Sequence, residues 1–227
     1  MMSRFIPSLG LLLATFALLT PSEVAAQGSR PASRPKSRPT SQPLQPAPKN
    51  LDLGGLHLKP DSGWKLRPTK GGWRKAELIL PAAAGSAAGE SGELIIYYFD
   101  RGGAGNAKSN LARWKQMFAR PSEMEASQFA KEEQFVANGM RISVLTVHGT
   151  YLGPSFEPLP KPLRKHMMLA AMIETPEGPY YIRTLGPEKT LKSWQKSWLQ
   201  LLRTAEPSTS AQNPQSQPKK PTSKPKE

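Results

Sequence analysis

The sequence contains no cysteine among its 227 residues. This absence excludes disulfide bonds, lipid attachment to a cysteine and metal sites built from thiolates. The fold therefore has to be stabilised by the packing of apolar side chains, which requires a domain long enough to bury a substantial core.

Long hydrophobic runs are almost absent, and the single one lies near the start of the chain. Arg4 precedes an apolar run over residues 9–20, and small residues lead up to Ala26. This pattern predicts a secretory signal peptide over residues 1–26, cleaved after Ala26. A membrane anchor would need about 20 apolar residues in a row, and prolines and Glu23 interrupt this segment. We therefore expect an exported protein, periplasmic or extracellular, with no transmembrane span after cleavage.

Large apolar side chains are also scarce in two terminal segments. Leu44 is the single large apolar residue in residues 27–50 and 206–227. Both segments are rich in Pro, Ser, Gln and basic residues. Ordering such segments would reduce conformational entropy without burying apolar surface. We predict a disordered basic linker over 27–50 and a disordered tail over 206–227, locally stiff where proline is dense. A single domain over residues 51–205 lies between them.

Acidic residues are few: 17 Asp and Glu stand against 31 Lys and Arg, for a net charge of +14. Residues 27–50 carry +5, residues 206–227 carry +2, and residues 51–205 carry the remaining +7. An exported basic chain suits anionic partners such as phospholipid head groups, acidic polysaccharide or extracellular nucleic acid. The alternative is that both tails are solubilising spacers without a specific partner. The candidate anion-binding residues of the first tail are Arg30, Arg34, Lys36 and Arg38.

The central domain shows signals for several strands and two hairpins. Short apolar runs predict strands at residues 76–81 and 93–99, with a further strand around 64–66. Asn138-Gly139 between two strand-like runs predicts an antiparallel hairpin with a type I′ turn. A second hairpin is predicted around residues 176–179.

Two amphipathic helices complete the predicted domain. The first starts from an N-cap at Ser109, places Leu111, Trp114 and Phe118 on one face, and ends before Pro121. The second has an apolar stripe of Leu191, Trp194, Trp198, Leu201 and Leu202, and Lys189, Lys192, Lys196 and Arg203 point away from it. Hairpins with few helices predict an α+β fold, with a mainly antiparallel sheet of about six strands.

The octet GGAGNAKS, residues 102–109, differs by one residue from the phosphate-binding loop G-x-x-x-x-G-K-[ST]. Ala107 occupies the place of the second glycine, where a Cβ hinders close approach of a phosphate. The domain has no repeated βαβ pattern, and export removes the protein from the compartment that holds nucleoside triphosphates. We therefore predict a structural glycine turn at Gly102, Gly103 and Gly105, with no nucleotide and no other cofactor.

Five sequence blocks resemble a family of exported, largely uncharacterised bacterial proteins. They are RKAELILP, GELIIYYFDRGGAG, NLARWKQMF, HGTY and GPYYIRTLGPEKTL, which cover most of residues 64–202 in order. In that family an aromatic strand runs into a Gly-rich turn and a helix with N-x-x-R-W. The resemblance implies that the turn is a feature of the fold and that Lys108 is incidental. The element order resembles, more distantly, the PsbP-like α/β/α sandwich, which implies a role in binding or assembly.

Residues suited to metal or acid–base chemistry form no recognisable motif. His57, His148 and His166 lack the spacing of a zinc site. No serine lies in a nucleophile-elbow motif. Asp100, at the end of an apolar strand, is the one carboxylate in a position typical of function, and capping of the turn explains it better. We predict no metal site and no catalytic residue.

The domain has its own candidate anion-binding residues, which are Arg67, Lys70, Arg74, Lys75, Lys161, Arg164 and Lys165. If the fold brings the first four beside the last three, a ligand with phosphate or sulfate groups would fit there. The alternative is a solvated charged surface.

These features predict an exported, non-catalytic binding or scaffolding protein of the cell envelope or extracellular space. We expect its partner to be an anionic envelope polymer or another envelope protein. Two alternatives remain open. The basic tails bind anionic polymers or membrane surfaces, or the protein is an enzyme with a site near the Gly-rich loop.

Overall fold

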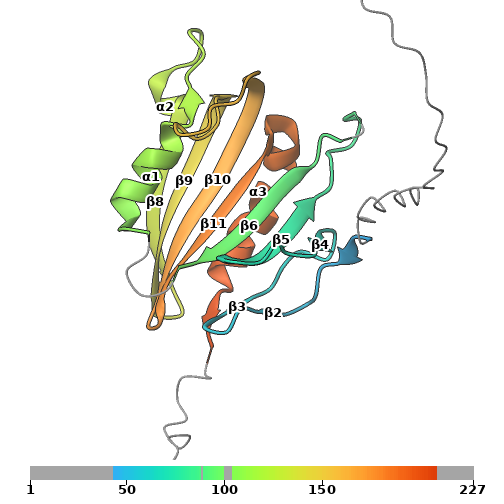
Figure 1. Ribbon diagram of the computed structural model, residues 1–227, viewed down its shortest axis with the longest axis vertical. Coiled ribbons are helices and arrows are strands. Elements are labelled where there is room, and N and C mark those ends of the chain that lie inside the picture. The colour runs from blue at the N-terminus through green and yellow to red at the C-terminus, as the bar shows by residue number, and fades with distance from the viewer. Residues whose placement is uncertain (1–42, 88, 100–103, 209–227) are drawn as a thin grey trace, which may run out of the picture. The chain divides into compact units, whose positions relative to one another are not determined.

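The computed structural model describes residues 43–87, 89–99 and 104–208 (Figure 1). Several predictions fall on other residues. The predicted signal peptide, the tail cations Arg30, Arg34, Lys36 and Arg38, Asp100, and the turn residues Gly102 and Gly103 all lie outside the described residues.

The described residues form mostly strands, with three helices. Their order is β1 (Gln45–Pro46), β2 (Leu51–Asp52), β3 (Leu56–Leu58), β4 (Lys65–Arg67), β5 (Arg74–Leu80), β6 (Gly92–Tyr98), α1 (Ala107–Lys115), β7 (Phe118–Ala119), α2 (Ala126–Phe129), β8 (Ala130–Ala137), β9 (Met140–Tyr151), β10 (Leu163–Thr175), β11 (Gly178–Pro187), α3 (Glu188–Arg203) and β12 (Glu206–Pro207).

One antiparallel sheet dominates the described structure and confirms the predicted mixed, strand-rich class. Its nine strands run in the order β1-β4-β5-β6-β11-β10-β9-β7, and β8 also pairs with β9. The prediction of about six strands was too low. β1 and β7 have two residues each, and strands this short have too few residues to show an alternating pattern.

Both predicted hairpins are present. β8 and β9 pair up to Ala137 and Met140, and the turn residues Asn138 and Gly139 have φ of 48° and 79°. Positive φ at both positions is what a type I′ turn requires. β10 and β11 form the second hairpin, and their pairing continues to Thr175 and Gly178.

The predicted C-terminal helix is also present and covers one face of the sheet. Leu191, Trp198, Leu201 and Leu202 of α3 are buried in one core cluster with sheet residues. The indole Nε1–H of Trp198 donates to Oγ1 of Thr184 at 2.8 Å, which satisfies a buried polar group. Burial of each such side chain contributes about 1.5–3 kcal/mol.

The first helix differs from the prediction at both ends. Its N-cap is Asn106, whose Oδ1 accepts the backbone N–H of Ser109 at 2.9 Å, and Ser109 lies inside the helix. Asn and Ser are about equally good N-caps, so local sequence alone does not choose between them. Phe118 was predicted to be helical, but it lies in β7, paired with Tyr151. It still joins Leu111 and Trp114 in a second core cluster.

A small sheet of three strands, in the order β12-β3-β2, was not predicted. Glu206 and Pro207 pair with β3, although both were assigned to the C-terminal tail. Gln45 and Pro46, assigned to the linker, pair with β4. The folded domain therefore extends beyond both predicted boundaries, residues 51 and 205.

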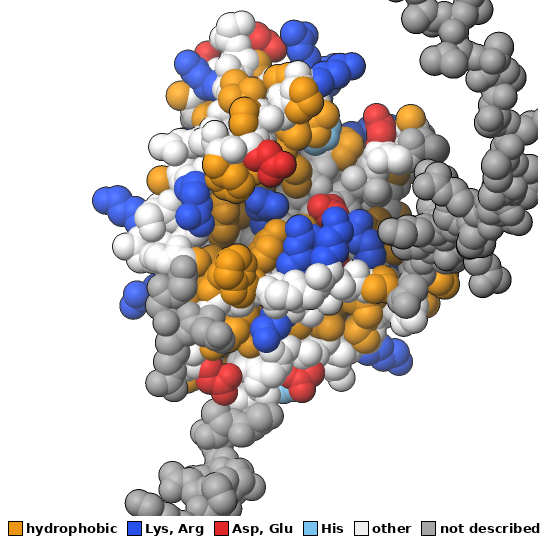
Figure 2. Space-filling view, in the orientation of Figure 1, with side chains coloured by type: hydrophobic (Ala, Val, Ile, Leu, Met, Phe, Trp, Pro, Cys, Tyr) orange, Lys and Arg blue, Asp and Glu red, His pale blue; other side chains and the backbone are white. Residues whose placement is uncertain are grey.

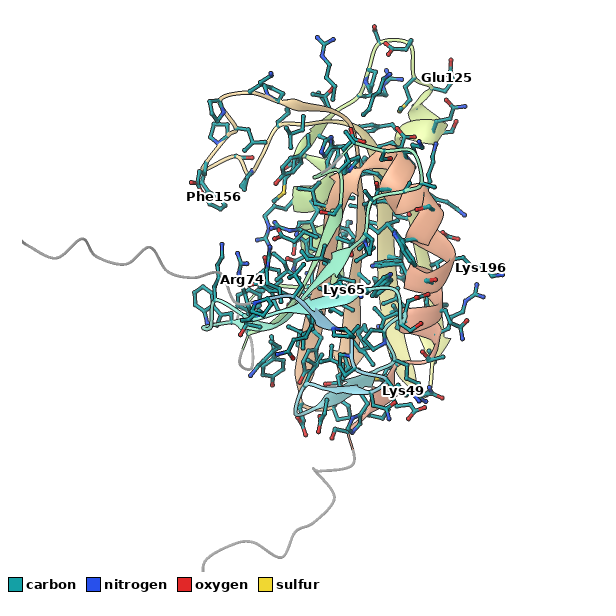
Figure 3. All side chains as sticks on the ribbon, turned by 90° about the vertical axis from the view of Figure 1, so that its right-hand side faces the viewer. Lys49, Lys65, Arg74, Glu125, Phe156 and Lys196 are labelled. Atoms are coloured by element: carbon teal, nitrogen blue, oxygen red, sulfur yellow. The ribbon has the colours of Figure 1, made fainter. Side chains whose placement is uncertain are left out.

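The two helical covers lie on opposite faces of the main sheet (Figures 1 and 3). α3 packs on β5, β10 and β11, whereas α1 packs on β9 and β10. In the described structure no helix lies in front of β5 and β6 on the α1 side. Within the described ranges, no helix is both long and apolar enough to cross a membrane.

Candidate functional site

The uncovered part of the sheet on the α1 side, which we call the open face, is formed by β4, β5, β6 and β11. Side chains that are directly opposite in register share a face, so Glu77, Ile95 and Arg183 lie in one row. Lys and Arg side chains gather in front of β5 and β6, with hydrophobic side chains beside them (Figure 2). The open face carries Arg67, Arg74, Glu77, Ile79, Glu93, Ile95, Tyr97, Arg183 and Leu185.

A fully buried carboxylate organises two of the arginines on the open face. Oε2 of Glu77 accepts hydrogen bonds from Nη2 and Nε of Arg67 at 2.7 and 3.0 Å. Oε1 accepts from Nη1 of Arg74 at 2.8 Å and from the backbone N–H of Lys70 at 3.3 Å. Arg67 also contacts Glu93. Both predicted arginines are therefore already paired with carboxylates.

The pKa values reflect this pairing. Burial alone would raise the pKa of Glu77, but hydrogen bonds from Arg74, Arg67 and the backbone of Lys70 outweigh burial and lower it. Burial opposes the charge of Arg67, yet its bonds to Glu93 and Glu77 raise its pKa above the usual value. Glu77 and Arg67 are thus ionised near neutral pH, each beside a partner of opposite charge.

A row of aromatic rings borders the arginines. The rings of Tyr97 and Phe99 are stacked, with their centroids 6.1 Å apart. The ring centroids of Phe99 and Trp73 are 5.2 Å apart. Trp73 is 67% exposed, which is unusual for a large aromatic side chain. The guanidinium carbons of Arg74 and Arg183 lie 5.8 and 5.9 Å from the centroid of Tyr97. The rings and the guanidinium groups thus form one continuous surface.

Arg183 differs from the other two arginines because it forms no ion pair with any described residue. It is half-buried in β11. Among the described residues, its one hydrogen bond runs from Nη2–H to the hydroxyl of Tyr97, at 3.4 Å. The planar set of N–H donors of a guanidinium matches a carboxylate or phosphate.

Sequence reasoning missed Arg183. It lies in YYIRTL, which was predicted only as one strand of the second hairpin. Its importance depends on which strands α1 leaves uncovered, and this is a property of the tertiary structure. A cation inside an otherwise apolar strand was the one signal in the sequence that pointed to it.

The fold does not join the two predicted groups of cations. Arg67 and Arg74 lie on the open face, Lys70 is exposed, and Lys75 places Nζ 5.4 Å from the centroid of Tyr98. Lys161, Arg164 and Lys165 lie at the start of β10. The strand pairing places Arg67 of β4 and Ala170 of β10 in the same row across the sheet. The two residues are four strands apart, so roughly 19 Å separates them. Lys165 is a further five residues, roughly 16 Å, along β10.

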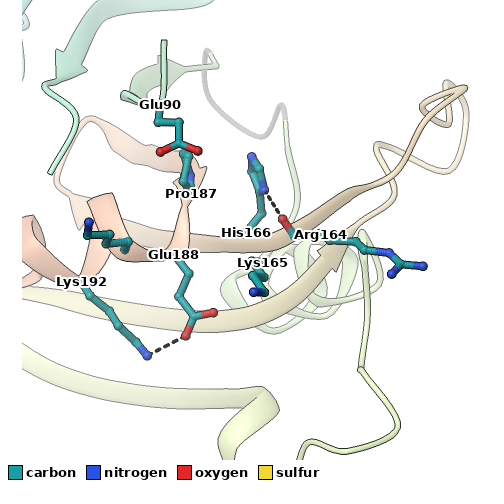
Figure 4. A pocket seen from close by; sticks show the side chains of 8 residues that line it. Glu90, Arg164, Lys165, His166, Pro187, Glu188 and Lys192 are labelled. Atoms are coloured by element: carbon teal, nitrogen blue, oxygen red, sulfur yellow. Dashed lines mark hydrogen bonds and ion pairs between the residues drawn. The ribbon is translucent and has the colours of Figure 1, made fainter. Parts of the chain in front are cut away.

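The start of β10 contains a bulge that exposes two of these cations. Leu163 pairs with Tyr151 and His166 with Gly149, so two residues of β10 oppose one of β9. Lys165 has φ of 52°, and Nδ1 of His166 lies 2.9 Å from the carbonyl oxygen of Arg164. A hollow of about 560 Å³ lies beside the bulge (Figure 4). Its lining residues are Glu90, Arg164, Lys165, His166, Pro187, Glu188, Lys189 and Lys192.

Carboxylates neutralise part of this hollow. Oε1 of Glu188 lies 2.6 Å from Nζ of Lys192 and 3.3 Å from Nδ1 of His148. Burial lowers the pKa of His148, and the charge of Glu188 offsets this only in part. His148 is therefore neutral at neutral pH, and the hollow is less basic than its lining suggests.

The residues weighed for catalysis or metal binding are dispersed. His57 contacts Asp52 at 3.7 Å. His148 contacts Glu188 and His166 contacts Arg164, so the three histidines share no partner in these contacts. Among the described residues, no three His, Asp or Glu side chains are arranged to hold a metal ion. Lys108 is exposed on α1, and Gly105 has φ of 79°, which fits its predicted role in the turn.

No protein-family model matches the chain, and no curated protein matches its sequence. The resemblance to exported bacterial proteins therefore stays a prediction, and the function is inferred from the geometry of the site.

Proposed function

We propose that this chain is an exported, non-catalytic binding protein that recognises an anionic polymer of the envelope or extracellular space on its open face. The observation that supports this most directly is Arg183, a half-buried guanidinium without a carboxylate partner among the described residues. A buried or half-buried charge is unfavourable unless an opposite charge accompanies it. An anionic group of a ligand supplies that charge.

The surroundings of Arg183 favour a ligand that combines rings with widely spaced charges. Tyr97, Phe99 and the exposed Trp73 offer flat apolar surfaces, which stack well on sugar rings or bases. Glu77 and Glu93 already neutralise Arg67. A polymer with very dense negative charge would meet these carboxylates. An acidic polysaccharide, with one carboxylate per sugar or fewer, fits the open face better.

The predicted PsbP-like α/β/α arrangement belongs to the same proposal. α1 and α3 lie on opposite faces of the sheet, and a sandwich of this kind would leave function to whatever surface the helices do not cover. Export after removal of residues 1–26 would bring the open face to the proposed ligand.

The test is equilibrium binding to polygalacturonate, a uronate polymer, with neutral dextran as the comparison, measured by calorimetry at two salt concentrations. We expect binding to polygalacturonate alone, weakened by salt. Arg183→Gln removes one charge-assisted contact worth about 1.5–3 kcal/mol. It should therefore weaken binding roughly tenfold to hundredfold.

Arg203→Gln is the matched control, because Arg203 is exposed on α3 on the other side of the sheet. It should leave the affinity unchanged. Deletion of residues 27–42 tests the tail alternative without removing β1. If that deletion abolishes binding while Arg183→Gln has no effect, the tails bind the polymer and the proposal for the open face is wrong.

A further inference from the structure

The loop over residues 152–162, between β9 and β10, presents an aromatic side chain to solvent. Phe156 is 85% exposed, the highest value among the large apolar side chains of the described residues. Among the described residues, no aromatic ring contacts the ring of Phe156. It lies at the outer end of the loop, on the side of the molecule away from Lys196 of α3 (Figure 3). This exposure leaves the apolar surface of the ring in contact with water.

The loop has an ordered base, so the exposure of Phe156 does not result from a lack of local structure. The N–H of Leu159 donates to the carbonyl of Leu152 at 2.7 Å, and the N–H of Leu152 donates to Met117 at 2.8 Å. The N–H of Glu157 donates to Pro154 at 3.0 Å. Leu159 packs against the core cluster beneath α1. These contacts hold the ends of the loop and direct its tip outward.

Three cations follow the aromatic tip along the chain. Lys161, Arg164 and Lys165 are exposed, and none of them forms an ion pair with a described residue. They line a hollow of about 1000 Å³ between residues 119–123 and the start of β10, together with one carboxylate, Glu123. Glu157 is the only acidic residue within the loop itself. The bulge in β10 exposes Arg164 and Lys165, because it removes them from the regular pairing with β9.

We infer that the 152–162 loop is a membrane-docking surface: Phe156 inserts into the interfacial region of an anionic bilayer while Lys161, Arg164 and Lys165 contact lipid head groups. An aromatic residue flanked by cations is the combination that favours a peripheral position at such an interface. The hollow that these cations line gives room for head groups. This surface shares no residue with the open face.

A bilayer explains the surface better than a protein partner does. A protein interface would require a larger apolar patch around Phe156, yet the tip is flanked by Ser155 and Glu157 and by prolines. A single ring on a narrow loop enters a lipid interface without needing complementary shape. The unpaired cations provide the charge complementarity that an anionic leaflet requires.

The absence of cysteine makes a direct test simple, because a single introduced cysteine is the only labelling site. Phe156→Cys and Lys196→Cys, each in the chain from residue 27 onward, are labelled with nitrobenzoxadiazole. Each is then mixed with vesicles of phosphatidylglycerol and phosphatidylcholine, or of phosphatidylcholine alone. We expect a blue shift and a rise in emission at position 156 with the anionic vesicles, and no change at position 196.

Vesicle sedimentation of unlabelled variants measures the affinity. Phe156→Ala should weaken binding by about tenfold or more, because it removes the inserted ring. The triple change Lys161→Gln, Arg164→Gln, Lys165→Gln should weaken it by roughly a hundredfold, about fivefold for each cation. Arg203→Gln, at an exposed position on α3, should have no effect.

Three results would overturn the inference. The chain fails to sediment with anionic vesicles, or it sediments without any change of the label at position 156, in which case the basic tails bind the lipid. The third is an equal change at positions 156 and 196, which indicates adsorption without a preferred orientation. Circular dichroism of each variant checks that a loss of binding does not reflect unfolding.

Discussion

The two faces of the main sheet are stabilised in different ways. On one face α3 lies across the strands, and its buried side chains are apolar apart from Thr190. On the other face α1 packs mainly on β9 and β10, and the strands farther from it hold a buried carboxylate with two arginines. Apolar packing needs a cover, whereas an ion-pair network can fill an uncovered surface and keep it hydrated. The first face supports the fold, and the second remains accessible to a ligand.

The largest effect is expected where the covered face is broken. Trp198→Ala removes a fully buried indole and its hydrogen bond to Thr184. The cavity and the unpaired hydroxyl should lower the free energy of unfolding by about 4 kcal/mol. Urea denaturation followed by fluorescence measures this change. Polygalacturonate affinity of the protein that remains folded should be unaltered, and a loss of affinity would mean that the two faces are coupled.

The open face should tolerate its key substitution better. Glu77→Gln leaves Arg67 and Arg74 without their shared carboxylate. Both arginines are partly exposed, so solvent reduces the effect relative to a fully buried pair. We expect a loss of about 2 kcal/mol in urea denaturation. Glu93→Gln, which removes only the more exposed partner of Arg67, is the control and should change stability much less.

The pH dependence of stability sharpens the contrast further. The pKa of Glu77 is lowered in the folded protein, so its ionised form contributes stability at pH values above the unfolded value of about 4.3. As the pH falls below that value, the unfolded chain binds the proton first, and stability declines until the pH has passed the folded pKa. Denaturation curves of wild type and Glu77→Gln should therefore converge in this acid range. Curves that stay parallel would contradict the role given to Glu77.

A smaller effect is expected at the turn that begins α1. Gly105 has φ of 79°, and a Cβ there would lie 3.2 Å from Oγ of Ser109. Gly105→Val should destabilise the domain by about 1–2 kcal/mol, since a β-branched residue is disfavoured at positive φ. Thermal unfolding measures this change. Gly71→Val is a useful comparison, because Gly71 also has positive φ but has no atom within 4 Å of an added Cβ.

Lys108→Ala should have the smallest effect. Lys108 is an exposed residue in the first turn of α1, and such surface changes usually alter stability by less than about 0.5 kcal/mol. Binding of ATP, measured by calorimetry, should be absent in both wild type and variant. A clear loss of nucleotide binding in the variant would revive the phosphate-loop interpretation.

The sequence predicted the turns and helices that a few neighbouring residues determine. Asn138-Gly139 specifies a turn almost by itself, and the spacing of Leu191, Trp198 and Leu202 identifies the buried side of α3. It failed for strands made by pairing partners that are distant in the chain. Glu206 belongs to a polar, Pro-rich tail by composition, and only the neighbouring His57 in β3 makes it a strand residue.

The candidate sites were predicted less well, because they depend on what is left uncovered. The arginines at positions 67 and 74 were identified as cations, but Glu77, which neutralises them, was read as an ordinary strand residue. Arg183 becomes distinctive because α1 packs mainly on β9 and β10 and reaches β11 at Tyr181, where Trp114 contacts it. Phe156 had a visible signal, an aromatic residue in a Pro-rich loop, and a search for exposed apolar side chains would have found it.

The small sheet has a mechanical consequence. The C-terminal strand β12 is attached through the pairs Glu206–His57 and Pro207–Leu56. The ion pair of Lys59 with Glu206 at 2.7 Å and the bond from the N–H of Ser208 to Gly55 at 3.1 Å add to this. Pro207 has no N–H to contribute. Tension applied to the chain beyond Ser208 acts on these contacts before it reaches α3. A pull on the C-terminus would therefore load the small sheet before the nine-stranded sheet.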